Sequence, residues 1–186
     1  LEFRRVLFRS DDSGGGWFHK KDAYRDSDWL VKHLIEIVCR NGCLLLNIPP
    51  RPDGTFSKQV KECLRGTGDW LSVNGEAIYG TRPWKTCMEK TSRQDYSSDM
   101  RFTRSKNGDT IYVICLEWPG KELKVTSLRD DFWMCPSEIK QVKMLGTDEK
   151  LKWSRDDVFF HVTLPEKHSY KHAFVIKVEF KDKIGN

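Results

Sequence analysis

The chain has 186 residues, 32 of them basic and 27 acidic, and a formal net charge of +5. Apolar side chains make up 38% of the residues, which is enough for a hydrophobic core and excludes a disordered or collagen-like chain. Basic and acidic residues alternate rather than forming a basic stripe, so the sequence predicts no nucleic-acid partner. No apolar run approaches the roughly 18 residues that a membrane span needs.

The first residues do not follow the pattern of a folded element. Residues 1–10 (LEFRRVLFRS) begin without Met and show no clear helical or strand period, and three glycines follow at 14–16. We therefore predict that residues 1–16 form a non-native or disordered leader and set them aside from the fold.

An α/β segment comes next. Asp26 or Ser27 can cap a helix that ends at Asn41-Gly42, where residues tolerant of a left-handed backbone stand. Cys43 to Ile48 predicts a strand buried on both faces, because its side chains are apolar on both. Ser57 then opens a second helix.

The pattern changes after Trp84 to short strands with turns between them. Asn107-Gly108 is a strong signal for a two-residue hairpin turn. The polar stretch 85–98 is predicted to be a linker, and residues 99–186 to form an antiparallel β-sandwich. Its strands are expected at 100–104, 110–118, 123–128, 139–145, 158–164 and 173–180.

Metal and cofactor chemistry has no signal in this sequence. The six cysteines include no C-x-x-C pair, and no cysteine–histidine cluster has the spacing of zinc ligands. We therefore expect no metal and no cofactor.

Two long strings carry a resemblance to a known family. Residues 41–47 (NGCLLLN) and 74–84 (NGEAIYGTRPW) resemble the family-29 glycoside hydrolases, the α-L-fucosidases. In that family these strings close the catalytic barrel just before a C-terminal β-sandwich. The later residues 99–103 (DMRFT) and Trp118-Pro119 look like the opening of that sandwich.

The resemblance implies an α/β plus all-β fold. Residues 17–84 would be the last helix–strand–helix portion of a (β/α)8 barrel, followed by the linker and the sandwich. A complete barrel needs roughly 250 residues, so we expect this chain to be a C-terminal fragment. The family suggests a lysosomal, secreted or periplasmic location.

The activity that the resemblance implies is that of a retaining exo-glycosidase removing terminal α-L-fucose from glycans. Such an enzyme uses a nucleophilic carboxylate and an acid/base carboxylate. In the family these are an Asp and a Glu that precede the matching residues, so we expect no catalytic residue here and an inactive fragment. Expected partners are fucosylated glycans or glycoconjugates, and a homo-oligomer of the full-length enzyme.

Three residues are candidates for contacting the sugar. Asn47 would lie at the C-terminal end of the last barrel strand, the face where barrel active sites are built; alternatively its amide holds the Pro49-Pro50 turn. Trp17 would form an apolar wall against the sugar or pack in the core. His19 would reach the mouth of the pocket or be structural.

Glu76 and Arg82 are predicted to be a buried ion-pair or hydrogen-bond pair that fixes the junction between barrel and sandwich. A second function is suggested by three tryptophans, because aromatic side chains on a sandwich can bind sugars. They are Trp84, Trp118 and Trp153. The alternative is therefore a non-catalytic carbohydrate-binding or structural β-sandwich module.

Overall fold

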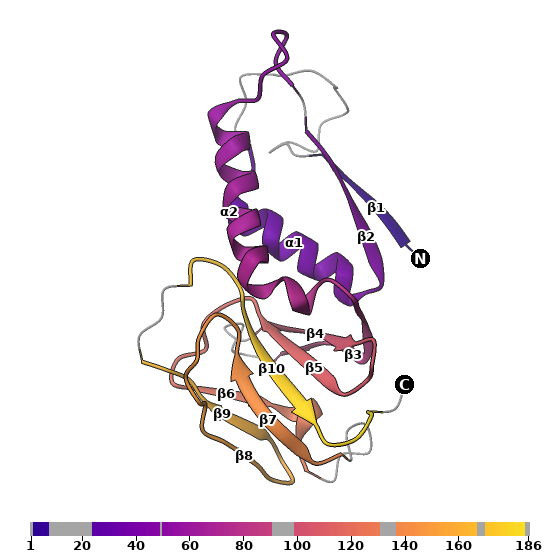
Figure 1. The fold of residues 1–186 in the computed structure, drawn as a ribbon, viewed down its shortest axis with the longest axis vertical. Helices are drawn as coiled ribbons and strands as arrows, with labels where there is room; N and C mark the ends of the chain where they lie inside the picture. Colours follow the sequence, from indigo (N-terminus) through magenta and orange to yellow (C-terminus); the bar gives the residue numbers. More distant parts are fainter. Residues whose placement is uncertain are drawn as a thin grey trace.

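The computed structural model describes residues 2–7, 24–48, 50–90, 99–130, 137–166 and 170–184. Two helices cover one face of a five-stranded sheet, and a three-stranded sheet covers the other (Figure 1). No described helix combines the length and the apolar character that crossing a membrane requires.

Both predicted helices form, each with a polar N-cap. Helix α1 (Ser27–Cys39) begins after Asp26, whose carboxylate accepts a hydrogen bond from the Trp29 backbone N–H at 2.8 Å. Helix α2 (Lys58–Asn74) begins after Ser57, and the short helix η1 (Gly75–Ala77) continues it. These caps satisfy N–H groups that have no partner within the helix. Asn41 ends the α1 segment with φ at 64°, the left-handed backbone expected there.

A two-stranded parallel sheet lies beside the helices, and one of its strands differs from the sequence-based expectation. Strand β1 (Glu2–Leu7) pairs with β2 (Gly42–Asn47), from Glu2 opposite Gly42 to Leu7 opposite Asn47. Residues 2–7 belong to the predicted leader that we set aside from the fold. Pairing with β2 holds these residues in a strand, although the order of apolar and polar residues in this segment does not indicate one.

Strand β2 is buried on one face only, so the prediction of burial on both faces is wrong. Leu44 and Leu46 pack against the helices, near Leu30 and Val60. Successive side chains of a strand point to opposite faces. Cys43 and Leu45 therefore point away from the helices; Cys43 is exposed and the Leu45 side chain is 60% exposed.

The sandwich consists of two antiparallel sheets. The larger has the order β3-β4-β5-β10-β7, and the smaller has the order β6-β9-β8. Their bounds are β3 (Thr81–Lys90), β4 (Asp99–Ser105), β5 (Thr110–Cys115), β6 (Glu122–Val125), β7 (Ile139–Met144), β8 (Trp153–Arg155), β9 (Phe160–Thr163) and β10 (Phe174–Phe180), with the short helix η2 (Thr126–Leu128) after β6.

Six of these strands were predicted, and two were not. Strands β3 and β8 are additional, and β3 also corrects the predicted linker at 85–98. Its residues 85–90 belong to a sheet strand, so the larger sheet begins directly after the helical segment. Residues 91–98 lie outside the described part of the chain.

The larger sheet is buried on both faces, which joins the helices and the sandwich into one packed unit. Along β5, Ile111 and Val113 face the smaller sheet, whereas Tyr112 and Ile114 face the helices. Each apolar side chain buried in this way contributes about 1.5–3 kcal/mol. A hairpin joins β4 and β5 at the predicted place, but its loop spans the four residues 106–109 rather than two, and φ of Gly108 is 81°.

Candidate functional site

Of the three residues predicted to contact the sugar, Asn47 is the one that the structure describes. It is the last residue of β2 and shares its face with Cys43 and Leu45, opposite the face that packs on the helices. No described residue hydrogen-bonds its side-chain amide, and Pro49 of the following turn lies outside the described residues. In a (β/α)8 barrel the helices pack outside, and the strand face turned away from them lines the interior. Asn47 therefore lies on the strand face that would line the interior of such a barrel.

The turn after β2 is organised by Asp53. Its carboxylate accepts hydrogen bonds from the backbone N–H of Thr55 at 2.9 Å and from the Thr55 hydroxyl at 2.8 Å. These bonds hold the pKa of Asp53 below its usual value. Gly54 has φ at 79°, a conformation that favours glycine. The Asp-Gly pair is therefore a turn-forming element.

Trp17 and His19, the other two predicted substrate contacts, lie outside the described residues and stay predictions. The described residues include no group of three or more potential metal ligands. Burial raises the pKa of the Cys39 thiol to about 12 and that of Cys63 to about 11, which keeps both protonated and unreactive.

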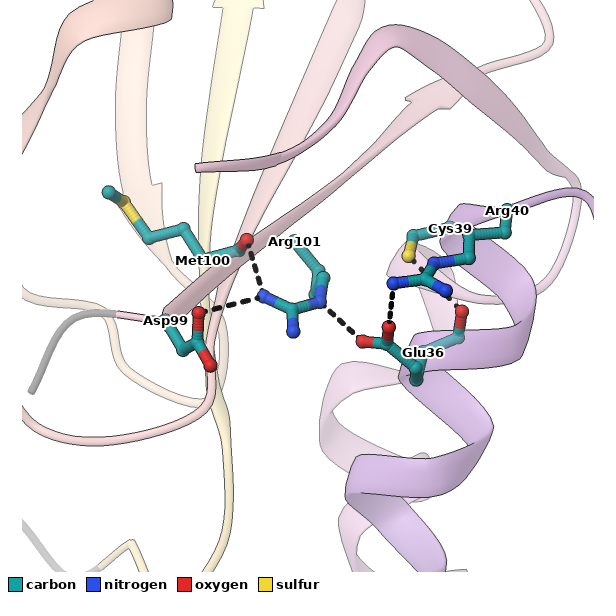
Figure 2. Close-up of polar contacts among 6 residues, drawn as sticks. All are labelled: Glu36, Cys39, Arg40, Asp99, Met100 and Arg101. Atoms are coloured by element: carbon teal, nitrogen blue, oxygen red, sulfur yellow. Dashed lines mark hydrogen bonds and ion pairs between the residues drawn. The ribbon is translucent and has the colours of Figure 1, made fainter. Parts of the chain in front are cut away.

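The junction between helices and sandwich is held by Arg101, which the sequence reasoning missed (Figure 2). This β4 side chain is buried, and its Nε donates to Glu36 of α1 at 2.5 Å. Its Nη1 donates to Asp99 at 3.2 Å and to the backbone carbonyl of Met100 at 3.0 Å. Burial lowers the pKa of the guanidinium, but the bonds and charges of Glu36 and Asp99 outweigh that effect and raise it. Arg40 contacts the same Glu36 carboxylate.

Glu76 and Arg82 do not form the predicted buried pair. Glu76 is exposed, and its carboxylate lies 3.3 Å from Nζ of Lys177 on β10. Arg82 is also exposed and donates to the backbone carbonyl of Thr81 at 3.0 Å. Glu76 does connect the helical segment to the sandwich, but through a different and solvent-accessible partner. The sequence-based prediction paired two residues of the same short string. The partner of Glu76 is instead Lys177, 101 residues further along the chain.

Other polar groups also cross this junction. The indole N–H of Trp70 on α2 donates to the backbone carbonyl of Ala173 at 2.6 Å. The hydroxyl of Thr103 on β4 donates to the carbonyl of Ala77 at 2.7 Å. Both bonds are buried. Sequence spacing carries no signal for them, because each joins segments that are distant along the chain.

The three tryptophans considered for sugar binding differ in exposure. Trp84 is buried and meets Phe102 edge-on, with ring centroids 5.3 Å apart. Trp118 is partly buried and packs on Phe174 with centroids 4.7 Å apart. Trp153 is 39% exposed. Of these three, Trp153 therefore presents the most indole surface to solvent.

Comparisons with known proteins give the class of this chain. The family model described as "Alpha-L-fucosidase" matches residues 7–76, and the model described as "Alpha-L-fucosidase C-terminal domain" matches residues 93–179. The two matches follow each other in the order of the helical segment and the sandwich. This order defines the class as the end of a catalytic barrel joined to its C-terminal β-sandwich.

Individual relatives agree with this class. An alpha-L-fucosidase of Branchiostoma floridae is 38% identical over 142 residues, which are 74% of this chain and 29% of the relative. The tissue alpha-L-fucosidase of Homo sapiens is 31% identical over 155 residues, or 81% of this chain and 31% of the relative. A crystal structure of Thermotoga maritima alpha-fucosidase in complex with fucose aligns with a TM-score of 0.76 and 27% identity, over 95% of this chain and 39% of that one.

The chain belongs to the α-L-fucosidase family. It spans about 30% of the length of these two curated relatives and corresponds to their C-terminal part. The match to the first family model begins at residue 7, within the segment that sequence analysis set aside.

Proposed function

We propose that this chain is the C-terminal part of a retaining exo-glycosidase that removes terminal α-L-fucose from glycans and glycoconjugates. The observation that carries the proposal is the consecutive match to the barrel and C-terminal models of one hydrolase family. The catalytic Asp and Glu of such an enzyme would belong to barrel strands that precede the matching residues. The 186-residue chain alone is therefore expected to be inactive.

In this proposal Asn47 contacts the substrate. Its amide offers one acceptor and two donor hydrogens, and a sugar hydroxyl can pair with either kind of group. Its place at the carboxyl end of β2, on the face turned away from the helices, supports this role. Trp17 and His19 remain proposed as the apolar wall and a polar contact at the pocket mouth.

The junction has a positioning role in the same proposal. Strand β2 connects α1 to α2, and α1 is tied to the sandwich by the Glu36–Arg101 bond. A buried hydrogen bond between a cation and a carboxylate restricts how the helix can move relative to the sheet. The sandwich would thereby hold β2, and with it Asn47, in a fixed place in the barrel.

The experiment is a chimera. Residues 17–180 of this chain replace the matching C-terminal part of the Branchiostoma floridae relative, and hydrolysis of 4-nitrophenyl α-L-fucopyranoside is measured. We expect the chimera to hydrolyse this substrate and the 186-residue chain not to. Asn47→Ala in the chimera should lower kcat/KM about tenfold, the effect of one hydrogen bond to substrate.

Gln59→Ala is the matched control, because it removes an amide from an exposed position on α2. A chimera that unfolds cooperatively but has no activity would contradict the proposal, and equal effects of the two substitutions would contradict the role of Asn47. Activity of the 186-residue chain alone would place the catalytic residues within it. The expected homo-oligomer is a separate proposal, decided by the mass of the active chimera in solution.

A further inference from the structure

A cavity of about 580 Å³ lies where α2 meets the segment before β10. Its volume is within the range of small-molecule sites, about 300–1,000 Å³. The segment 170–172 also lines a second cavity of about 220 Å³, on the side of Trp118 and Phe174. The α2 side contributes Glu62, Arg65, Asp69, Trp70, Val73 and Asn74.

Among the described residues that line the larger cavity, carboxylates and cations balance. Glu62 and Asp69 bring two carboxylates, and Arg65 and Lys171 bring two cations. A ligand with a net charge would therefore meet a like charge as well as an opposite one. A neutral ligand whose groups both donate and accept hydrogen bonds can use all four side chains.

Asn74 adds a specific requirement for a donor. This lining residue is only 2% exposed, and its Nδ2 donates to the Trp70 carbonyl at 3.2 Å. Its Oδ1 has no hydrogen-bond partner among the described residues. A buried acceptor left without a partner costs about 1–3 kcal/mol, so a ligand hydroxyl that reached it would recover stability.

The walls are fixed and partly apolar. The Trp70–Ala173 bond ties α2 to the opposite wall. His172 contacts the Ser27 hydroxyl and the Asp28 carboxylate of α1, each at 3.3 Å. Val73 is 43% exposed and Tyr170 is half-buried, which gives apolar surface between the polar groups. A ring with apolar faces and a rim of hydroxyls matches this surface.

We propose that this junction cavity binds one neutral pyranose residue of a glycan. The site belongs to the described chain alone, and it is independent of the proposed hydrolysis because its readout is binding to the 186-residue chain. The smaller cavity beyond Tyr170 would take an adjoining sugar residue of the same glycan.

The test is saturation-transfer NMR on the 186-residue chain with methyl β-D-galactopyranoside and methyl α-L-fucopyranoside as neutral probes. We expect at least one to bind with a millimolar Kd, and D-glucuronate to bind more weakly. Asp69→Ala, at an exposed position of the cavity wall, should weaken binding about tenfold, as expected for a charged hydrogen-bond partner. Asp148→Ala removes an exposed carboxylate outside the cavity and should leave binding unchanged.

Asn74→Leu removes the unpaired acceptor and should also weaken binding. Thermal unfolding of the variant shows whether its fold is retained. If that variant does not fold, Asp69→Ala decides the outcome. The proposal is overturned if neither neutral probe binds, which would leave the cavity to water. It is equally overturned if Asp69→Ala has no effect, or if Trp153→Ala on the smaller sheet removes the signal instead.

Discussion

At the scale of single residues, the Arg101 guanidinium is the best-defined polar feature of the junction. It bonds Glu36 on a helix and Asp99 on its own strand, and its side chain is 8% exposed. A buried cation needs such partners, because burial without them is far more costly than the bonds are favourable.

Replacing Arg101 by Met keeps a long side chain but removes every donor. We expect the free energy of unfolding to fall by about 2 kcal/mol, the usual value of hydrogen bonds to charged groups, as measured by urea denaturation. Lys58→Met is the control, because the Lys58–Glu62 pair lies on the surface with 88% and 59% exposure and should change stability by less than about 0.5 kcal/mol. Similar losses in both variants would show that the junction bond adds no stability.

His161 on β9 lies between two carboxylates. Its Nδ1 lies 2.8 Å from Glu122, and its Nε2 lies 2.9 Å from Asp156. Both nitrogens can donate only when the ring is protonated. Hydrogen bonds from His161 and Lys124 hold the pKa of Glu122 below its usual value. The pKa of Asp156 is lowered by hydrogen bonds from the backbone N–H groups of Phe159 and Val158 and from His161.

Stability should therefore fall as the pH drops below about 4.5, because the unfolded chain, with ordinary carboxyl pKa values, binds these protons first. We expect His161→Asn to flatten this decline, since Glu122 loses its main partner. The midpoint of urea unfolding, measured from pH 6 to pH 3, gives the slope of stability against pH for the wild type and for His161→Asn. Glu166→Gln, which removes one partner of an exposed ion pair with Lys121, should leave the slope as it is. A parallel decline in wild type and His161→Asn would be evidence against this linkage.

At the scale of elements, the helices and strands with local signals were predictable. Asp26, Ser57 and the Asn107-Gly108 pair act through neighbours a few residues away, so the sequence shows them directly. Strand β3 was missed because it contains Pro83 and shifts register between Pro83 and Met88, which breaks the two-residue alternation. Strand β8 has three residues, too few for a periodic pattern.

The candidate site was predictable in part for the same reason. The place of Asn47 at the end of a strand was predictable, because a local string indicates that strand. Arg101, Trp70 and the cavity depend on segments brought together only by folding, such as α2 and the residues before β10. The error over Glu76 has the same origin, since Lys177 is its partner.

The Trp70 bond allows the coupling of α2 to the sandwich to be measured. Trp70→Phe keeps an aromatic ring but leaves the buried carbonyl of Ala173 without its donor. We expect a loss of about 1.5 kcal/mol in the free energy of unfolding. Trp153→Phe, at a 39% exposed position, should cost less than about 0.5 kcal/mol. An equal cost for both would mean that the cross-junction bond is replaced by water without loss.

At the scale of the whole molecule, Leu45 is one of several large apolar side chains that the described residues expose. Leu45 is 60% exposed on β2, on the face that would turn to the interior of a barrel. Exposed apolar strand surface promotes association. We expect the 186-residue chain to self-associate and to bind a hydrophobic dye, and Leu45→Lys to reduce both. Val158→Lys, at a 49% exposed position away from β2, is the control. A monomeric wild-type chain without dye binding would contradict this expectation.

The place of β10 determines when the sandwich can form during synthesis. It is the last described strand in sequence order, yet it lies between β5 and β7 in the larger sheet, and β7 pairs with no other described strand of that sheet. A ribosome therefore releases the strands β3 to β9 before the strand that joins them exists, so closure of the sheet waits until β10 has been synthesised. A stop codon before Phe174 would remove the strand between β5 and β7 and so divide this sheet in two, and we expect cellular proteases to degrade the shortened product.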